Sequence, residues 1–425
     1  MTELLVGTKK GLFVLEGGSD GEFEITARAF AGEPVDYAMR DPRSGRVIAS
    51  MTSPFYGPKL WHAEDPAGEW TQAEGVVLPA DADGALERIW VIVAGEADGS
   101  LYAGGDPGVL FESGDGGATW GLNSALWEHP TRPSWEPGGG GLCLHSIVTW
   151  PEDPDRLALG ISAAGVWLTD DRGRTWRQGN DGLVARYLPE EAREGSTSLC
   201  VHRLRRAPTR PERVFMQFHG GVYRSDDAGE TWTDIGVGLP SDFAFPLVLD
   251  PADPDSAYVI PLRADMDRVT PNGAVRVYET RDAGASWRAR GDGLPQRDAY
   301  LTVLRHAFDQ AGEGRPSSCT SARRRERSSA RPTPASAGSP WPGGCRRSTP
   351  SPPPADPEIA RPAHVRSTPT RASEPSTIRP CGRAWPPGTR RAPPGSPRPP
   401  ASDARARARA RPRRRSAWRG RRRAP

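Results

Sequence analysis

Ser113-Gly-Asp115-Gly-Gly-Ala-Thr119-Trp120 is the first full copy of a pattern that recurs three more times in the chain. The pattern is S/T-x-D-x-G-x-S/T-W, and the later copies cover residues 169–176, 225–232 and 280–287. Successive tryptophans are 56, 56 and 55 residues apart. A period of this size is typical of stacked or radial repeats, so the fold is expected to be built from one repeated unit.

The pattern describes a tight turn that leads into a strand. Its Asp carboxylate can accept backbone N–H groups, its Gly can adopt a positive φ, and its Trp ring can pack against the sheet. We therefore expect a structural role for the Asp and Trp of all four copies, which are Asp115, Trp120, Asp171, Trp176, Asp227, Trp232, Asp282 and Trp287.

Short apolar segments recur in the same order within each repeat. Residues 143–178 contain four of them, bounded by turns, and such segments are typical of strands in four-stranded blades. With these strands called A to D, further B strands begin near Leu4, Val47, Leu101, Val214 and Ala257. The sequence predicts an all-β fold, a β-propeller of four-stranded blades, with six blades legible of a total of seven. The first blade lacks its A strand.

The end of the chain has a different composition from the rest. Residues 316–425 hold 26 Arg, no Lys and 5 Asp or Glu, which leaves 30 basic and 48 acidic residues in 1–315. The end contains no Leu, Phe, Tyr or Met, and cannot bury enough apolar surface to offset the entropy of ordering its chain. We predict one propeller domain over residues 1–315 and a disordered Arg/Pro/Ser-rich tail over residues 316–425.

The tail also reads as the product of a shifted reading frame. Codons compatible with residues 328–338, read from each third base, permit Phe-Gly-Ser-Ala-Asp-Ala-Gly-Glu-Arg-Trp, which repeats the turn pattern. The stretch after Arg315 permits a B strand, and residues 342–351 permit the missing A strand. We predict a frameshift that replaces the last blade. The alternative is a basic arm for nucleic acid, and the absence of Lys argues against it.

The four turn sequences and their spacing resemble the Asp-box, or BNR, repeat family, which includes sialidases, sortilin-type receptors and the photosystem II assembly factor. The resemblance covers residues 1–315. Outside the sialidases it implies a non-catalytic propeller that binds a small molecule, glycan or protein on its top face. For a sialidase it implies an arginine triad, an Asp acid and a Tyr–Glu pair. The chain departs from that pattern, because the string nearest to the family's Arg-Ile-Pro element is Glu-Arg-Ile-Trp at residues 87–90.

Two A strands begin alike, with Leu-Cys-Leu-His145 and Leu-Cys-Val-His202, and His219 ends the B strand of the second of these blades. The equivalent positions in neighbouring blades are Trp90 and Phe245. We expect these side chains to line a ligand-binding mouth at the top of the propeller. Tyr56 and Arg263, on B-to-C loops, are further candidates for ligand binding.

Three interpretations of the histidines stay open: a repeated channel wall, a ligand or catalytic site, and a zinc site. Each Cys-x-His pair puts sulfur and imidazole on one face of a strand. Adjacent A strands diverge from the axis, however, so no metal is predicted, and no cofactor either. The alternative function is a glycoside hydrolase of the sialidase-like type, with Asp106 and Asp265 as its carboxylate pair.

The start of the chain shows no basic leader followed by an apolar segment, and no run of 18 apolar residues occurs anywhere. We therefore expect a cytoplasmic protein without membrane contact. The acidic balance of residues 1–315 disfavours nucleic acid and anionic substrates as partners.

Overall fold

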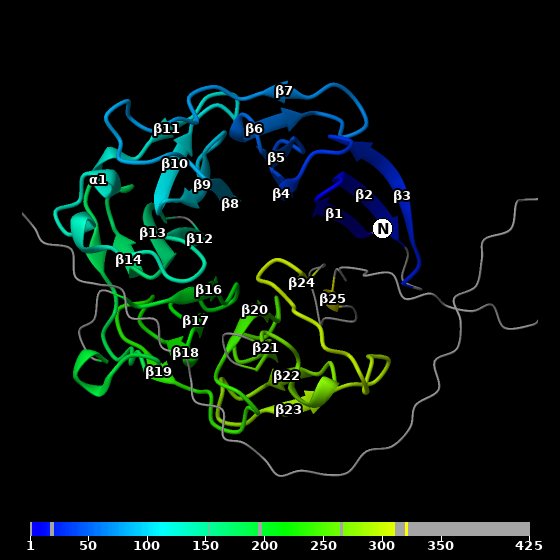
Figure 1. Ribbon diagram of the computed structural model, residues 1–425, viewed down its shortest axis with the longest axis vertical. Coiled ribbons are helices and arrows are strands. Elements are labelled where there is room, and N and C mark those ends of the chain that lie inside the picture. The colour runs from blue at the N-terminus through cyan, green and yellow to red at the C-terminus, as the bar shows by residue number, and fades with distance from the viewer. Residues whose placement is uncertain are drawn as a thin grey trace, which may run out of the picture. The chain divides into compact units, whose positions relative to one another are not determined.

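The computed structural model describes residues 2–17, 21–151, 153–193, 198–263 and 267–310, together with the backbone of 319–321. Residues 1–333 form one compact unit, in which small sheets follow one another around a central axis (Figure 1). The predictions about the tail, including its disorder and its shifted frame, lie outside the described residues. No helix of the described part is long and apolar enough to cross a membrane.

Seven sheets make up the described part of the ring. The first has three strands, β1 (Thr2–Thr8), β2 (Gly11–Gly17) and β3 (Phe23–Ala29). The next two have four each: β4 (Val35–Arg40), β5 (Val47–Ser53), β6 (Gly57–Ala63) and β7 (Thr71–Gln72), then β8 (Arg88–Ala94), β9 (Leu101–Asp106), β10 (Val109–Ser113) and β11 (Gly121–Leu122).

Three more four-stranded sheets continue the ring. They are β12 (Cys143–Trp150) with β13 (Asp153–Ser162), β14 (Gly165–Thr169) and β15 (Arg177–Gln178); β16 (Val201–Arg206) with β17 (Val214–Phe218), β18 (Gly221–Ser225) and β19 (Thr233–Asp234); and β20 (Ala244–Leu249) with β21 (Ala257–Pro261), β22 (Val277–Thr280) and β23 (Arg288–Arg290). The last sheet pairs β24 (Phe308–Gln310) with β25 (Cys319–Ser321). The described helices are short: α1 (Ser124–Trp127), η1 (Arg132–Ser134), η2 (Glu190–Ala192) and η3 (Pro271–Gly273).

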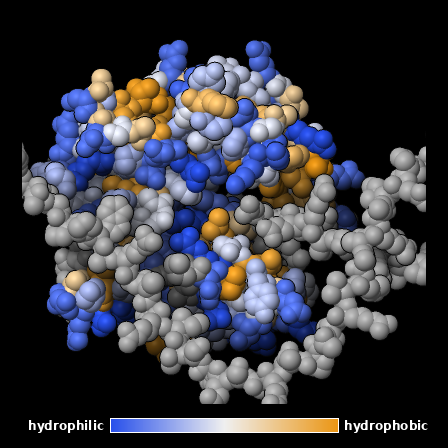
Figure 2. All heavy atoms as spheres, viewed as in Figure 1, coloured by the Kyte–Doolittle hydropathy of each residue, from blue (hydrophilic) through white to orange (hydrophobic). Residues whose placement is uncertain are grey.

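Within every sheet the strands are ordered as in the sequence and neighbours are antiparallel, as short turns between successive strands require. This radial arrangement of antiparallel sheets confirms the predicted all-β propeller of four-stranded blades. The first sheet has three strands among the described residues, and the described part supplies no A strand on the inner side of β1, as the sequence predicts. Apolar residues gather between neighbouring sheets, whereas the face visible in Figure 2 is largely hydrophilic with scattered apolar patches.

The repeated turns are held by their own side chains. The Asp171 carboxylate accepts hydrogen bonds from the Thr175 hydroxyl at 2.7 Å, the Thr175 N–H at 2.9 Å and the Thr169 hydroxyl at 2.7 Å. The Thr169 oxygen in turn accepts from the N–H of Gly173, whose φ is 74°. Asp115, Asp227 and Asp282 make the same set of bonds, so the four turns are structural equivalents.

The tryptophan that ends each turn joins its blade to the blade before it. Trp176 donates its Nε1–H to Oδ1 of Asn123 at 3.1 Å, Trp232 to the carbonyl of Gly179 at 2.9 Å, and Trp287 to the carbonyl of Ile235 at 2.7 Å. Trp120 donates within its own turn instead, to Gly117. These bonds cross each boundary between sheets 53, 53 and 52 residues apart in sequence.

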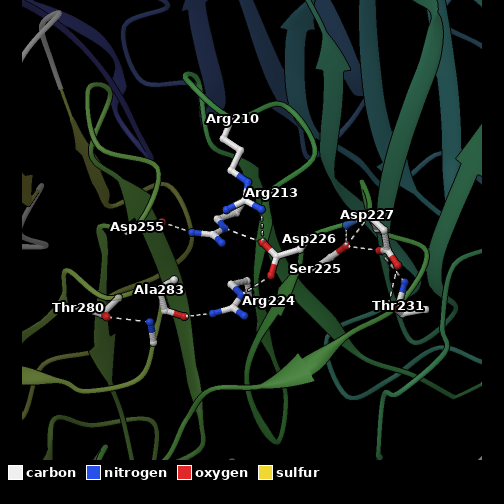
Figure 3. A network of polar contacts seen from close by, with 12 residues as sticks. Arg210, Arg213, Arg224, Ser225, Asp226, Asp227, Thr231, Asp255, Thr280 and Ala283 are labelled. Carbon is white, nitrogen blue, oxygen red and sulfur yellow. Dashed lines mark hydrogen bonds and ion pairs between the residues drawn. The ribbon is translucent and has the colours of Figure 1, made fainter.

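Charged side chains join the fifth and sixth sheets near the same turns (Figure 3). Arg213, whose side chain is only 7% exposed, pairs with Asp226 of its own blade and with Asp255 of the next. Arg224 also pairs with Asp226 and donates to the carbonyl of Ala283 at 2.6 Å. Because Arg213 is buried, loss of either carboxylate leaves a poorly solvated charge.

Low pH should destabilise the repeated Asp turns, because their carboxylates become protonated. The hydrogen bonds from Thr175, followed by that from Thr169, lower the pKa of Asp171 from 3.8 to about 2. A depressed pKa stabilises the fold above the unfolded-state value and that contribution is lost as the pH falls towards about 2. We predict that Asp171→Asn flattens the decline of the urea unfolding midpoint between pH ~4 and ~2. The exposed Asp83→Asn is the control and should keep the decline; an unchanged decline in Asp171→Asn contradicts the prediction.

The frameshift hypothesis predicts that this chain is poorly soluble, because it would lack the last blade of the ring. β1 is the innermost strand of its sheet and has no partner on its inner side among the described residues, and unpaired strand edges promote association. We predict that a gene restored in frame near Gly314 gives a higher soluble yield than this chain under matched expression. Equal yields, or an unbroken frame on resequencing, would contradict the frameshift hypothesis.

Candidate functional site

Five blades carry a one-residue irregularity at the same place in the innermost strand. The pairing register shifts between Val35 and Tyr37, Ile89 and Val91, Leu144 and Ser146, Val201 and Arg203, and Ala244 and Leu247. The residues skipped by these β-bulges are Asp36, Trp90, His145, His202, and Phe245 with Pro246. A bulge re-aims the side chain that it frees from pairing.

The skipped residues Trp90, His202 and Phe245 meet at Arg305, which precedes β24. The Arg305 guanidinium carbon lies 5.5 Å from the centre of the Trp90 ring and 5.0 Å from that of Phe245, within the range of cation–π attraction. Its Nε–H donates to the carbonyl of His202 at 3.1 Å. Arg88 lies over the Trp90 ring at 4.7 Å and pairs with Asp36 at 3.2 Å. We call Trp90, His202, His219, Phe245 and Arg305 the central site.

Two of the predicted histidines lie side by side in the central site. The ring centres of His202 and His219 are 5.2 Å apart, and Phe245 stacks on His202 at 4.7 Å. His202 is 2% exposed and shares a 2.5 Å hydrogen bond between Nδ1 and the carbonyl of Ala244. Burial, and then the charge of Arg305, hold the pKa of His202 well below its usual value. His202 is therefore a neutral imidazole.

His145 belongs to the same electrostatic environment but is closed off. It is 0% exposed, its Nδ1 lies 3.3 Å from the hydroxyl of Ser146, and its Nε2 has no hydrogen-bond partner. Burial first, then the charge of Arg305, lowers the pKa of His145 well below its usual value. His145 is therefore neutral, and its burial supports the interpretation that it forms part of the repeated channel wall.

A second buried cation lies next to the central site. Arg203, 5% exposed, donates to Nδ1 of His306 at 2.9 Å, and the His306 ring meets the ring of Tyr37 edge-on at 4.7 Å. Burial lowers the pKa of Arg203 to about 9, so its guanidinium stays charged at neutral pH. Across the described ranges, neither Arg203 nor Arg305 forms an ion pair with a carboxylate. The centre of the ring therefore carries uncompensated positive charge.

Asp106 is turned towards a thiol rather than towards a second carboxylate. The Cys143 thiol donates to Oδ2 of Asp106 at 3.4 Å, and burial raises the pKa of Asp106. Gly141 lies beside it with a φ of 101°, a conformation that favours glycine. Asp265, its predicted partner, lies outside the described residues, so the predicted carboxylate pair is not tested.

The side chains of Tyr56 and Arg263 are largely exposed to solvent. Tyr56 is 80% exposed. The Arg263 side chain is 65% exposed and pairs with Asp267 at 3.7 Å. Tyr187, which lies between β15 and η2, has its ring 4.4 Å from that of His219. Trp135, which follows η1, packs on Trp167 in the core.

Sequence reasoning missed Arg305, Arg203, His306 and Arg88. A lone arginine in a strand carries no motif, and Arg203 sits directly beside the predicted His202. Arg305 directly follows the segment Leu-Thr-Val-Leu at residues 301–304. The position of Arg305 in the repeat could have identified it as a site residue, because Arg305 falls close to the strand position that holds His145, His202 and Phe245 in earlier blades.

One group among the described residues has the composition and spacing for a metal ion. The ligand atoms of Cys200, His202 and His219 all lie within 4.8 Å of one another. Both Cys143 and Cys200 are free thiols.

The strand order and the convergence of side chains at the centre define the chain as a β-propeller with a candidate binding site on its axis. No protein-family model matches the chain, and no curated protein does. Similar solved structures include an ancestral GH74 enzyme (17% identity, TM-score 0.45, 62% of this chain and 32% of that one) and the Niastella koreensis GH74 enzyme (15%, 0.48, 67% and 42%). Another is YCF48 bound to D1 peptide (16%, 0.43, 68% and 76%). This chain spans less than half of either GH74 chain.

The pairing of Asp106 with Cys143 can be tested by alkylation. Burial, and then the negative charge of Asp106, raises the pKa of Cys143, and the thiolate is the reactive form. We predict that iodoacetamide modifies Cys143 in the native chain roughly tenfold or more slowly than in urea, and that Asp106→Asn increases the native rate. Peptide mass mapping measures both rates. A native rate that Asp106→Asn leaves unchanged would show that burial alone protects the thiol.

Proposed function

We propose that the chain is a ligand-binding propeller whose central site holds a small anionic molecule with a flat apolar face. The observation that carries the proposal is Arg305, a cation held between the rings of Trp90 and Phe245 with no carboxylate partner in the described residues. Arg305 is partly buried, and a charge that is partly removed from water without a partner is costly. An anionic ligand would lower that cost when it binds.

The distribution of charge supports an anion over a cation. Residues 1–315 carry 30 basic and 48 acidic residues, yet Arg305 and Arg203 gather at the centre of the ring without acidic partners there. This local reversal departs from the expectation that the acidic body disfavours anionic partners. A planar guanidinium suits a carboxylate because it can donate two parallel hydrogen bonds. The rings of Trp90 and Phe245 would contact the apolar face of the ligand.

The glycoside hydrolase alternative has weaker support. It requires two carboxyl groups on either side of a bond, about 5 to 9.5 Å apart. Of the carboxylates near the centre, Asp36 is engaged by Thr52 at 2.5 Å and by Arg88 at 3.2 Å, and Asp106 by Cys143. The raised pKa of Asp106 suits a general acid, so turnover of glycosides remains the outcome that would favour this alternative.

Two finer assignments belong to the same proposal. We assign the four Asp- and Trp-containing turns to the Asp-box repeat type, supported by the shared hydrogen bonds of Asp171 and its equivalents. We also propose a cytoplasmic location, with which the free thiols of Cys143 and Cys200 agree. A protein or glycan partner would use the same face if its contact group were a carboxylate.

Benzoate and benzamide test the proposal, because they share a ring and differ in charge. We predict that benzoate raises the melting temperature of the full chain and that benzamide does not. Arg305→Gln should weaken benzoate binding about tenfold or more, since hydrogen bonds to a charged group contribute ~1.5–3 kcal/mol. Differential scanning calorimetry measures the change in melting temperature, and isothermal titration calorimetry measures the change in affinity.

Arg297→Gln is the matched control, because Arg297 is exposed and lies outside the central site. It should bind benzoate like the unmodified chain. Equal binding of benzamide, or unchanged binding in Arg305→Gln, would refute the anion site. Hydrolysis of 4-nitrophenyl glycosides by the full chain would replace it with the hydrolase alternative.

A further inference from the structure

We propose that Cys200, His202 and His219 form a three-ligand site for a divalent metal ion of the zinc class. Their ligand atoms lie within 4.8 Å of one another, with His202 buried and the other two partly exposed. One thiolate and two imidazoles are the donors that zinc prefers, and three protein ligands leave a fourth position for an exchangeable ligand. The proposal goes beyond anion binding. It shares His202 and His219 with the central site, but it depends on Cys200 and does not depend on Arg305.

The backbone brings these three residues together. The N–H of His219 donates to the carbonyl of Cys200 at 3.0 Å, which places the two residues opposite each other on neighbouring strands. Next along, Val201 pairs with Phe218 and Arg203 with Gln217, so the bulge falls on His202. All three side chains reach the same side, since their ligand atoms lie within 4.8 Å of one another.

The surroundings hold the ligands in orientations that suit a metal. The 2.5 Å contact between Nδ1 of His202 and the carbonyl of Ala244 fixes the proton on Nδ1 and leaves Nε2 with its lone pair. Metal-binding histidines are commonly held by such a bond. The Ser162 hydroxyl lies 3.2 Å from the Cys200 sulfur, within reach to donate to a thiolate. Tyr187 accepts from the N–H of Cys200 at 2.8 Å.

The neighbouring blade supplies an internal comparison. It has the same Cys-x-His sequence, at Cys143 and His145, but Ser162 stands opposite Cys143 where His219 stands opposite Cys200. The Cys143 sulfur is directed to the carbonyl of Gly140 at 3.1 Å and to Asp106. Repetition of the channel wall therefore explains the two Cys-x-His pairs but not His219, which completes a ligand set in only one of the described sheets.

The three ligand atoms must move closer together when a metal ion binds. With Zn–S near 2.3 Å and Zn–N near 2.0–2.1 Å, tetrahedral ligand atoms are about 3.4 Å apart. Rotation about the side-chain bonds of Cys200 and His219 supplies the needed ~1 Å, because both are partly exposed. Arg305 donates to the carbonyl of His202, and its positive charge favours an anion, such as hydroxide or a carboxylate, at the fourth position.

Cobalt(II) and zinc(II) titrations of the chelator-treated full chain test the proposal. Cobalt should give a thiolate-to-metal charge-transfer band that is absent in Cys200→Ser and strongly reduced in His219→Gln. Zinc should raise the melting temperature of the chain. Competition with a chromophoric chelator should show zinc affinity falling about a hundredfold or more in either variant.

Cys143→Ser is the matched control, because this variant removes the equivalent thiol of the neighbouring blade. It should keep the cobalt band and the zinc affinity. The tail contains further residues that could bind a metal ion, which are Cys319, Cys345, Cys381 and His364. The test therefore depends on the difference in cobalt and zinc binding between the variants. Circular dichroism that matches the unmodified chain establishes that each variant is folded. A cobalt band of equal strength in Cys200→Ser, or no zinc-dependent stabilisation of the unmodified chain, overturns the metal site.

Discussion

The central site depends on one backbone irregularity, a single unpaired residue in the innermost strand of five successive blades. A regular strand alternates its side chains between two faces, and both faces of an inner strand pack against neighbouring blades. The bulge frees one residue per blade from this alternation. Asp36, Trp90, His145, His202 and Phe245 all occupy that position, so one repeated backbone feature collects chemically different side chains at one place.

The rest of the repeat holds that position fixed. Each four-residue Asp turn is closed by its own hydroxyl and carboxylate groups, and each later tryptophan bonds to the preceding blade. Arg213 adds an ionic connection between two blades. Rigid neighbours matter for binding, because a cation such as Arg305 is held between two aromatic rings from blades far apart in sequence.

The sequence predicts the fold well because the same turn pattern occurs in it four times. The Asp and Trp positions, the order of the strands and the missing first strand all follow from residues close together in the chain. The central site is less accessible to such reasoning. His145, His202 and His219 stood out through their strand positions, whereas Arg305 and Arg203 carry no local pattern, and Tyr56 and Arg263 were chosen from exposed loops. The pairing of Cys200 with His219 depends on a register that only the folded sheet displays.

The direction of the tryptophan bonds gives the ring an order of assembly. Trp176, Trp232 and Trp287 each donate to an acceptor that comes 52 or 53 residues earlier in the chain. During synthesis from the N-terminus, every such donor emerges after its acceptor has left the ribosome, so each blade can dock on a finished neighbour. Under the frameshift hypothesis, loss of the final blade would remove no acceptor that an earlier tryptophan needs. A reading-frame change late in the gene can thus leave the preceding blades folded.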